Sequence, residues 1–171
     1  NSVERGGGGI FCEESRSTIF RNQITGNHAF EGGGIKCRES RATVSENEIT
    51  QNQSAYGGGL DCVNDSSIIF RNKISDNMAG SGGGICCMGL CHGKISSNQI
   101  FDNSGDGAGG GILVDGGGLV IINNMIAGNT SLGNSYSRGG GICLTFGAVS
   151  IISQNTIFAN EALRGGGISC E

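Results

Sequence analysis

The feature that most constrains the fold of this chain is a unit of three glycines followed by an aliphatic residue, which recurs along its whole length. The unit ends at seven positions, which are Ile10, Ile35, Leu60, Ile85, Ile112, Ile142 and Ile168. The intervals between these positions run from 25 to 30 residues. A repeat of this length is typical of a solenoid, in which each copy forms one structural unit that packs on the next.

A second pattern lies between the glycine units and reads aliphatic-x-x-Asn-x-Ile-x-x-Asn in all six intervals. Its first asparagine is Asn22, Asn47, Asn72, Asn98, Asn124 and Asn155. Its second asparagine is Asn27, Asn52, Asn77, Asn103, Asn129 and Asn160. Each turn of the solenoid therefore carries two asparagines at constant offsets from aliphatic residues that we expect to be buried.

The composition of the repeat decides among solenoid architectures. A leucine-rich repeat needs a lattice of leucines, and helical repeats need longer units and good helix formers. Here each unit holds three glycines, two asparagines and several β-branched residues, which favour short strands. The sequence thus predicts an all-β fold, a right-handed parallel β-helix of six to seven turns with 25–30 residues per turn. Residues 1–171 are expected to form a single β-helix domain.

We expect three short strands in each turn. In the second repeat the first strand is Ile35, Lys36 and Cys37, the second holds Thr43 and Val44, and the third is centred on Ile49. Because side chains alternate along a strand, Ile35 and Cys37 point inward and Lys36 points outward. The corresponding outward positions form a chemically mixed set that we expect to face solvent, namely Phe11, Lys36, Asp61, Cys86, Leu113, Cys143 and Ser169.

The two sets of asparagines are predicted to have a structural role at the bends between strands. Asparagine tolerates the left-handed backbone conformation that a sharp bend requires. Amides stacked about 4.8 Å apart also hydrogen-bond along the axis, so each set is expected to form one ladder. The alternative is a row of solvent-facing amides that bind sugar or ice.

The glycine triplets are predicted to form the tight corners of the stack, because a residue without a side chain allows close backbone approach. The alternative for a glycine-rich segment is a phosphate-binding loop. That loop is followed by a helix and often by Lys-Ser or Lys-Thr, whereas every triplet here leads into a strand.

Five of the eight cysteines follow the aliphatic residue of a glycine unit by two positions. They are Cys12, Cys37, Cys62, Cys87 and Cys170. Two other turns place Val114 and Leu144 there, so the slot is predicted to lie in the core and to hold a ladder of thiols. Stacked neighbours also fall within disulfide range, which leaves a cross-link between adjacent turns as an alternative.

The remaining cysteines, Cys86, Cys91 and Cys143, break this register and are expected outside the core or in loops. One interpretation is a disulfide between Cys86 and Cys91 in an exported protein. A second is covalent haem, because the segment from Cys87 to His92 resembles a C-x-x-C-H motif with one added residue; the candidate residues are Cys87, Cys91, His92 and His28. A third is a metal site made from Cys86, Cys91, His92 and Cys143.

An active site is not expected from the sequence. Lys36 and Arg38 beside Asp61 form a small charged patch without the paired acids that general acid–base chemistry needs. The chain has no tryptophan and two tyrosines, which is few for stacking on sugars. The longest inserted loop, 130–138, offers Tyr136 and Arg138. We therefore expect no enzyme and no cofactor, with a polysaccharide lyase, hydrolase or epimerase as the alternative.

Charge and hydropathy limit the partners. The net charge of −4 provides no basic surface for nucleic acid, and the chain has no apolar run of about 18 residues that would span a membrane. No amphipathic segment that would cap an end of the stack is visible in the sequence. We expect either a fragment of a longer surface protein or a subunit that stacks end to end into a fibre.

The unit GGGI-x-C … I-x-x-N-x-I-x-x-N-x-A resembles the right-handed parallel β-helix repeats of bacterial cell-surface and secreted proteins. It is also similar to the GGAI/FxxN repeats in the passenger domains of chlamydial polymorphic membrane proteins, although this chain has Ile or Val in place of the Phe. The resemblance implies an extracellular or cell-surface scaffold with a structural or adhesive role. Its partners would be further copies of itself, a surface polysaccharide or a host cell-surface protein.

Overall fold

The computed structural model of the protein describes residues 1–3 and 6–171, and these residues form 26 short strands in four parallel sheets. Sheet A consists of β1 (Ser2–Val3), β5 (His28–Ala29), β9 (Gln53–Tyr56), β13 (Met78–Ser81), β17 (Ser104–Gly105), β21 (Thr130–Ser131) and β25 (Glu161–Ala162). Sheet B consists of β2 (Ile10–Glu13), β6 (Ile35–Arg38), β10 (Leu60–Val63), β14 (Ile85–Met88), β18 (Ile112–Asp115), β22 (Ile142–Thr145) and β26 (Ile168–Cys170).

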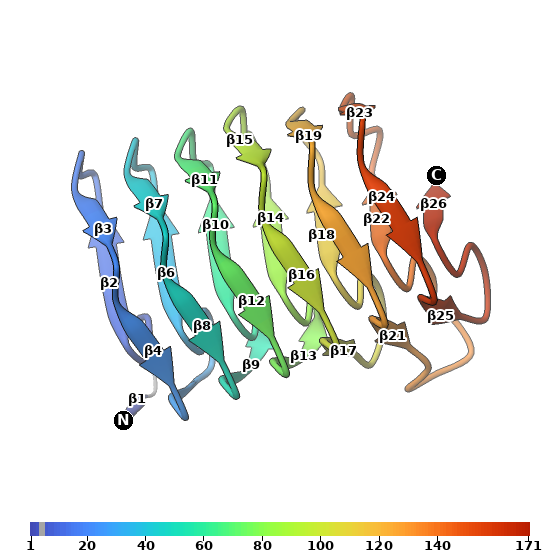
Figure 1. Cartoon of the computed structure of the whole chain (residues 1–171), viewed down its shortest axis with the longest axis horizontal. Helices are drawn as coiled ribbons and strands as arrows, with labels where there is room; N and C mark the ends of the chain where they lie inside the picture. The colour runs from blue at the N-terminus through green and yellow to red at the C-terminus, as the bar shows by residue number, and fades with distance from the viewer. Residues whose placement is uncertain (4–5) are drawn as a thin grey trace.

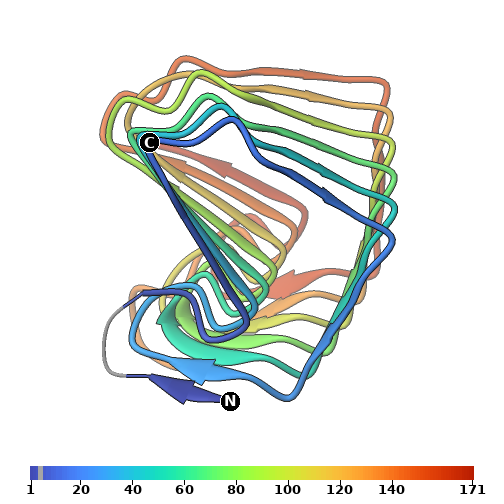
Figure 2. The ribbon, with the colours of Figure 1, turned by 90° about the vertical axis from the view of Figure 1, so that its left-hand side faces the viewer.

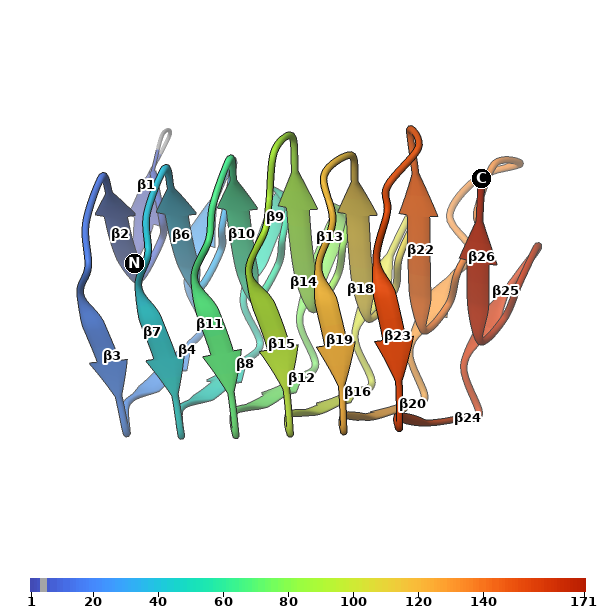
Figure 3. The same cartoon turned by 90° about the horizontal axis from the view of Figure 1, so that it is seen from above.

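The other two sheets have six strands each. Sheet C consists of β3 (Thr18–Phe20), β7 (Thr43–Ser45), β11 (Ile68–Phe70), β15 (Lys94–Ser96), β19 (Val120–Ile122) and β23 (Ile151–Ser153). Sheet D consists of β4 (Gln23–Thr25), β8 (Glu48–Thr50), β12 (Lys73–Ser75), β16 (Gln99–Phe101), β20 (Met125–Ala127) and β24 (Thr156–Phe158). The chain passes through sheets B, C, D and A in each turn, and every strand pairs in parallel with its equivalents in the adjacent turns (Figures 1 and 3).

The predicted parallel β-helix is confirmed, with one correction to the number of strands. The three predicted strands of the second repeat are β6, β7 and β8. Each turn also contains a fourth strand, in sheet A, that the sequence does not predict. These strands are two to four residues long and include pairs such as Ser104–Gly105, which lack the β-branched residues that mark a strand.

The core is a column of aliphatic side chains that runs along the whole stack. Sheets B, C and D each contribute one large inward residue per turn, for example Ile85, Ile95 and Ile100, which are all at most 1% exposed. In-register pairing places each residue directly on its counterpart in the next turn, as in the pair of Ile85 with Ile112. Ladders of like side chains therefore fill the interior without gaps between turns.

Both predicted asparagine ladders are confirmed. Asn47 is typical, since its Nδ2 donates to Oδ1 of Asn72 at 3.0 Å and to the backbone carbonyl of Ile19 at 2.9 Å. Its backbone N–H also donates to Oδ1 of Asn72, at 2.9 Å. The second ladder repeats this arrangement from Asn27 to Asn160. Each amide thus satisfies backbone groups at a bend where the regular sheet hydrogen bonds stop.

The prediction that these asparagines adopt the left-handed conformation is wrong. The residue before each ladder asparagine adopts it instead, for example Glu46 with φ of 53° and Gln51 with φ of 56°. The residues at this position vary in type, including Arg21, Ser97 and Ala159. The asparagine is required for its side-chain hydrogen bonds, while the strained backbone position accepts several residue types.

The glycine triplets form tight corners, as predicted. A Cβ atom on Gly33 would lie 2.6 Å from the carbonyl oxygen of Gly58, and one on Gly34 would lie 2.6 Å from that of Gly59. The first glycine of the last six triplets, from Gly32 to Gly165, has a positive φ and turns the chain back over sheet B. A Cβ on Gly32 would lie 2.8 Å from the Cβ of Lys36. Viewed along the stack, the outline of each turn bends inward at one side (Figure 2).

This inward bend corrects the prediction that the outward positions of sheet B face solvent. The central members of the set are buried, and they are Lys36, Asp61, Cys86, Leu113 and Cys143. A second column beside them consists of the residues that precede the glycine triplets, which are Glu31, Tyr56, Ser81, Ala108 and Arg138. Glu31 accepts a hydrogen bond from Lys36, and Ala108 packs against the cluster of Cys86, Leu113 and Cys143. We call this second interior, formed by these two sets of residues, the sheet B recess.

Candidate functional site

The predicted ladder of core thiols is present in the first four turns. Cys12, Cys37, Cys62 and Cys87 are buried, and each thiol hydrogen-bonds to the next. The hydrogen bond to Cys37, followed by burial, raises the pKa of the Cys12 thiol far above its usual value. Cys170 pairs in register with Leu144 but is exposed. The four buried thiols therefore act as small apolar core residues that stay protonated.

The prediction that the three remaining cysteines lie outside the core or in loops is wrong for Cys86 and Cys143, whereas Cys91 lies in the loop between β14 and β15 but is buried. Cys86 and Cys143 are fully buried in the sheet B recess, where Leu113 separates them. Cys91 is buried in the main core beside Cys87. All eight cysteines belong to the described residues, and all eight are free. The predicted disulfide between Cys86 and Cys91 is not formed, because the two thiols lie on opposite faces of sheet B.

The haem and metal candidates are also kept apart. Cys87 and Cys91 face the core, whereas His92 and His28 are exposed in different turns. Cys86 and Cys143 lie on the other face of sheet B. Within residues 1–3 and 6–171, no group of three or more His, Cys, Asp or Glu side chains is placed to hold a metal ion. These residues therefore do not form the haem or metal site considered from the sequence.

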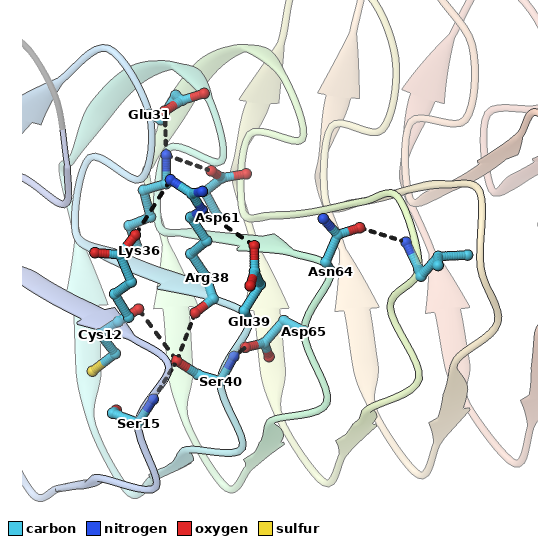
Figure 4. Close-up of polar contacts among 12 residues, drawn as sticks. Cys12, Ser15, Glu31, Lys36, Arg38, Glu39, Ser40, Asp61, Asn64 and Asp65 are labelled. Carbon is cyan, nitrogen blue, oxygen red and sulfur yellow. Dashed lines mark hydrogen bonds and ion pairs between the residues drawn. The ribbon is translucent and has the colours of Figure 1, made fainter.

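A charged cluster occupies the sheet B recess in the second and third turns (Figure 4). Lys36 and Asp61 are register partners on β6 and β10, and Lys36 Nζ lies 4.0 Å from Asp61 Oδ2. Lys36 Nζ also donates to Glu31 Oε2. Asp61 is fully buried, and neither of its carboxyl oxygens has a hydrogen-bond partner among the described residues.

The environment of Asp61 changes its titration. Burial raises the pKa of the Asp61 carboxyl to about 7, although the nearby Lys36 acts in the opposite direction. Glu31 adds a second carboxylate to the cluster, which corrects the expectation that this patch has no paired acids. Glu31 was not predicted from the sequence, because this residue belongs to an irregular segment that pairs with Tyr56 through an isolated bridge. Its position directly before a glycine triplet was the available signal.

Two shallow grooves open onto the recess. The Phe11 groove has a volume of about 460 Å³ and is lined by Gly6, Phe11, Glu13, Phe30, Glu31, Lys36 and Arg38. In it, Arg38 Nη1 lies 3.3 Å from Glu13 Oε1. Both aromatic rings are exposed. This groove therefore presents charged and aromatic side chains together.

The Tyr136 groove lies over the later turns and has a volume of about 450 Å³. It is lined by Ser81, Gly107, Ala108, Leu113, Asp115, Asn134, Tyr136, Arg138, Thr145, Phe146 and Glu171. Tyr136 and Phe146 are 72% and 85% exposed and belong to two different loops. Arg138 forms an ion pair with Glu171, and its Nε donates to the carbonyl of Tyr136 at 2.9 Å. The inserted loop 130–138, which stands out in the sequence, thus lines part of this groove.

The family model that describes a right-handed β-helix region matches residues 8–171. The chain belongs to the right-handed β-helix family. No curated protein and no solved structure matches this β-helix. Among its described residues, no helix is long and apolar enough to cross a membrane. The family includes a wide range of functions, so the grooves of this β-helix are the basis for a functional proposal.

Proposed function

We propose that this β-helix is an extracellular adhesive scaffold that binds a surface polysaccharide without transforming it. The observation that carries the proposal is the Tyr136 groove, which two exposed aromatic rings from different loops line together with Leu113, Asp115 and Thr145. Exposed aromatic rings on a rigid framework are typical of binding surfaces.

The chemistry of the groove fits a saccharide. Aromatic faces pack against the C–H groups of a sugar ring, while the carboxylate of Asp115, the amide of Asn134 and the guanidinium of Arg138 offer hydrogen bonds to hydroxyl groups. An open groove also suits one residue of a long polymer better than a small molecule, which binds in an enclosed cavity.

The scaffold part of the proposal is supported by the two asparagine ladders and the stacked core. Each turn is joined to the next by strand hydrogen bonds in four sheets and by two side-chain amides. A stack with so many contacts between neighbours resists bending, so it holds surface groups at constant spacing. The end-to-end association expected from the sequence stays a prediction, which sedimentation velocity over a concentration series tests.

Affinity electrophoresis through gels that contain neutral or acidic polysaccharides tests the binding proposal. We expect retardation by at least one polysaccharide. The double variant Tyr136→Ala/Phe146→Ala should weaken it by about fivefold or more, because each aromatic contact contributes roughly 0.5–1.5 kcal/mol. Phe158→Ala is the matched control, since Phe158 is exposed on β24 outside the groove. The proposal is wrong if no polysaccharide retards the protein, or if the double variant and the control bind equally.

A carbohydrate-active enzyme is the second candidate, and the Lys36 cluster is the observation that favours it. A carboxyl group with a pKa near neutrality, beside a second carboxylate and an amine, is a common arrangement for acid–base catalysis. Incubation with the same polysaccharides, followed by measurement of new reducing ends and unsaturated products, separates the two candidates. Product formation that is lost in Asp61→Ala would replace the adhesive proposal with a catalytic one.

A further inference from the structure

Glu31, Lys36 and Asp61 form the charged cluster of the sheet B recess, and an ion pair alone does not explain their arrangement. The Lys36 side chain is 8% exposed and that of Asp61 is 0% exposed, so both polar groups lie away from water. Asp61 receives no hydrogen bond from any described residue, although a buried carboxylate normally accepts several. On its other side, the register partner of Asp61 is Cys86, a buried thiol that supplies no positive charge.

We propose that Lys36 Nζ and Asp61 Cγ condense to an isopeptide bond that joins β6 to β10, with Glu31 as the proton acceptor. The reacting groups are held together by strand pairing, since Lys36 and Asp61 are directly opposite each other in sheet B. Lys36 Nζ lies 4.0 Å from Oδ2 of the Asp61 carboxyl group, so the amine is held beside the group that it attacks.

The chemistry balances without an oxidant or a cofactor. Glu31 Oε2, which accepts a hydrogen bond from Lys36 Nζ, removes one proton and frees the electron pair of the amine. The amine attacks Cγ of the protonated Asp61 carboxyl group, so the Nζ–Cγ bond forms and one C–O bond breaks. The leaving hydroxyl takes the second proton of Nζ and departs as water. Glu31 then returns its proton to solvent.

The recess favours the reaction in two ways. Burial, despite the opposing effect of Lys36, raises the pKa of Asp61, and the protonated form of a carboxyl group is the one that loses hydroxyl readily. Both side chains are also buried, and this limits the access of water that would hydrolyse the amide. The amide that forms is neutral, so the costly buried charge of the Lys36 amine is also removed.

A second ion pair between turns provides a matched control within the same chain. Lys73 Nζ lies 2.7 Å from Glu48 Oε1, and these residues are register partners in sheet D. Both side chains are more than 40% exposed, so water solvates the carboxylate and keeps the amine charged. Close approach alone is thus present at both pairs, whereas burial is present at one. We expect a bond at Lys36 and none at Lys73.

Intact-protein mass spectrometry of the purified, denatured chain tests the proposal. We expect a mass below that of the sequence by one water molecule, and a peptide map in which the segments holding Lys36 and Asp61 migrate as one branched species. Peptides with Lys73 and Glu48 should stay linear. A mass equal to that of the sequence, or a water loss that maps elsewhere, would overturn the proposal.

Two variants sharpen the assignment of roles. Asp61→Asn should lose one ammonia relative to its own sequence mass, because an amide can replace the carboxyl as the group attacked. Glu31→Gln should keep the full sequence mass while its circular dichroism stays that of the parent protein. If the cross-link persists in Glu31→Gln, Glu31 is not the proton acceptor. An Asp61 held in an amide has no free carboxyl, so a positive result also excludes its use as an acid or base on a polysaccharide.

Discussion

The two faces of sheet B differ although the same strands build both. On the inner face, the first inward position of each strand holds Ile or Leu, and the second holds Cys, Val or Leu. Apolar side chains therefore stack on apolar side chains from turn to turn. On the outer face the slot changes from Lys36 to Asp61, then to Cys86 and Leu113. The inner face is constant because each residue must fit its neighbours in the stack. The outer face is closed by a different segment in each turn and is free to vary.

The largest effect is expected where a change breaks the corner that separates the two faces. In Gly83→Val, the new Cβ would lie 2.4 Å from the carbonyl oxygen of Ser104 and 2.6 Å from that of Gly110. Backbone cannot move aside as a side chain can, so we expect loss of cooperative folding, seen as loss of the thermal transition in circular dichroism. Gly26→Ala is the control, since its Cβ meets nothing within 4 Å and costs about 1 kcal/mol for its positive φ. Equal behaviour of the two variants would contradict the role given to the corner.

A pair of neighbouring residues compares the faces directly. Ile112 belongs to the main core, whereas Leu113 belongs to the small cluster with Cys86 and Cys143. We expect Ile112→Ala to lower the free energy of unfolding by about 4 kcal/mol and Leu113→Ala by about 2 kcal/mol, because the small cluster can relax into the groove. Urea denaturation of both variants measures the difference. A larger loss for Leu113→Ala would show that the recess, not the column of isoleucines, is the main core.

Variants of the asparagine ladders measure how much the side-chain hydrogen bonds at the bends contribute to the stability of the stack. Asn72→Ala removes the Oδ1 atom that accepts two hydrogen bonds from Asn47 at a buried bend. One comes from the backbone N–H of Asn47 and the other from its side-chain Nδ2. We expect a loss of about 3 kcal/mol in the free energy of unfolding. Gln99→Ala on the exposed face of β16 should change it by less than about 0.5 kcal/mol. An Asn72→Ala protein as stable as the control would mean that water replaces the ladder.

The smallest effect concerns thiol access and needs no change in stability. Of the eight cysteines, Cys170 is exposed and seven are buried, in the main core or in the sheet B recess. A disulfide reagent should therefore modify one thiol quickly in the native protein and the others only as it unfolds. Cys170→Ser should remove the fast phase. A fast phase of several thiols would show that the recess opens to solvent on the time scale of the assay.

Most of the structural features that recur in every turn were predicted from the sequence. The glycine interval, the isoleucine slots and the asparagine pairs each report a contact between a residue and its own equivalent in the next turn, so one period of sequence contains the information. The strands of sheet A escaped prediction because the side chain that each buries is small, such as Ala29, Ala79 or Ser131, and a small residue does not mark a strand. The sequence also misplaced the left-handed residue by one position, because the hydrogen bonds of the asparagine, and not its backbone preference, explain its recurrence.

The charged cluster shows what the repeat could not predict. Glu31, Lys36 and Asp61 come from two turns and three segments, and they meet because Gly32, the first glycine of its triplet, folds the chain back over sheet B. Alternation along a strand told us that Lys36 and Asp61 point away from the core, but not that a second layer of backbone covers them.

By itself the sequence determined the parallel β-helix, its period, its core and its two ladders, because each of these follows from stacking identical positions at one spacing. Only the tertiary structure decided which outward residues are buried and which carboxylate lies beside which amine. Those contacts depend on the path of irregular backbone between sheets A and B, where no hydrophobic period constrains the chain. The part of this protein that we expect to carry chemistry therefore lies where its repeat is least regular.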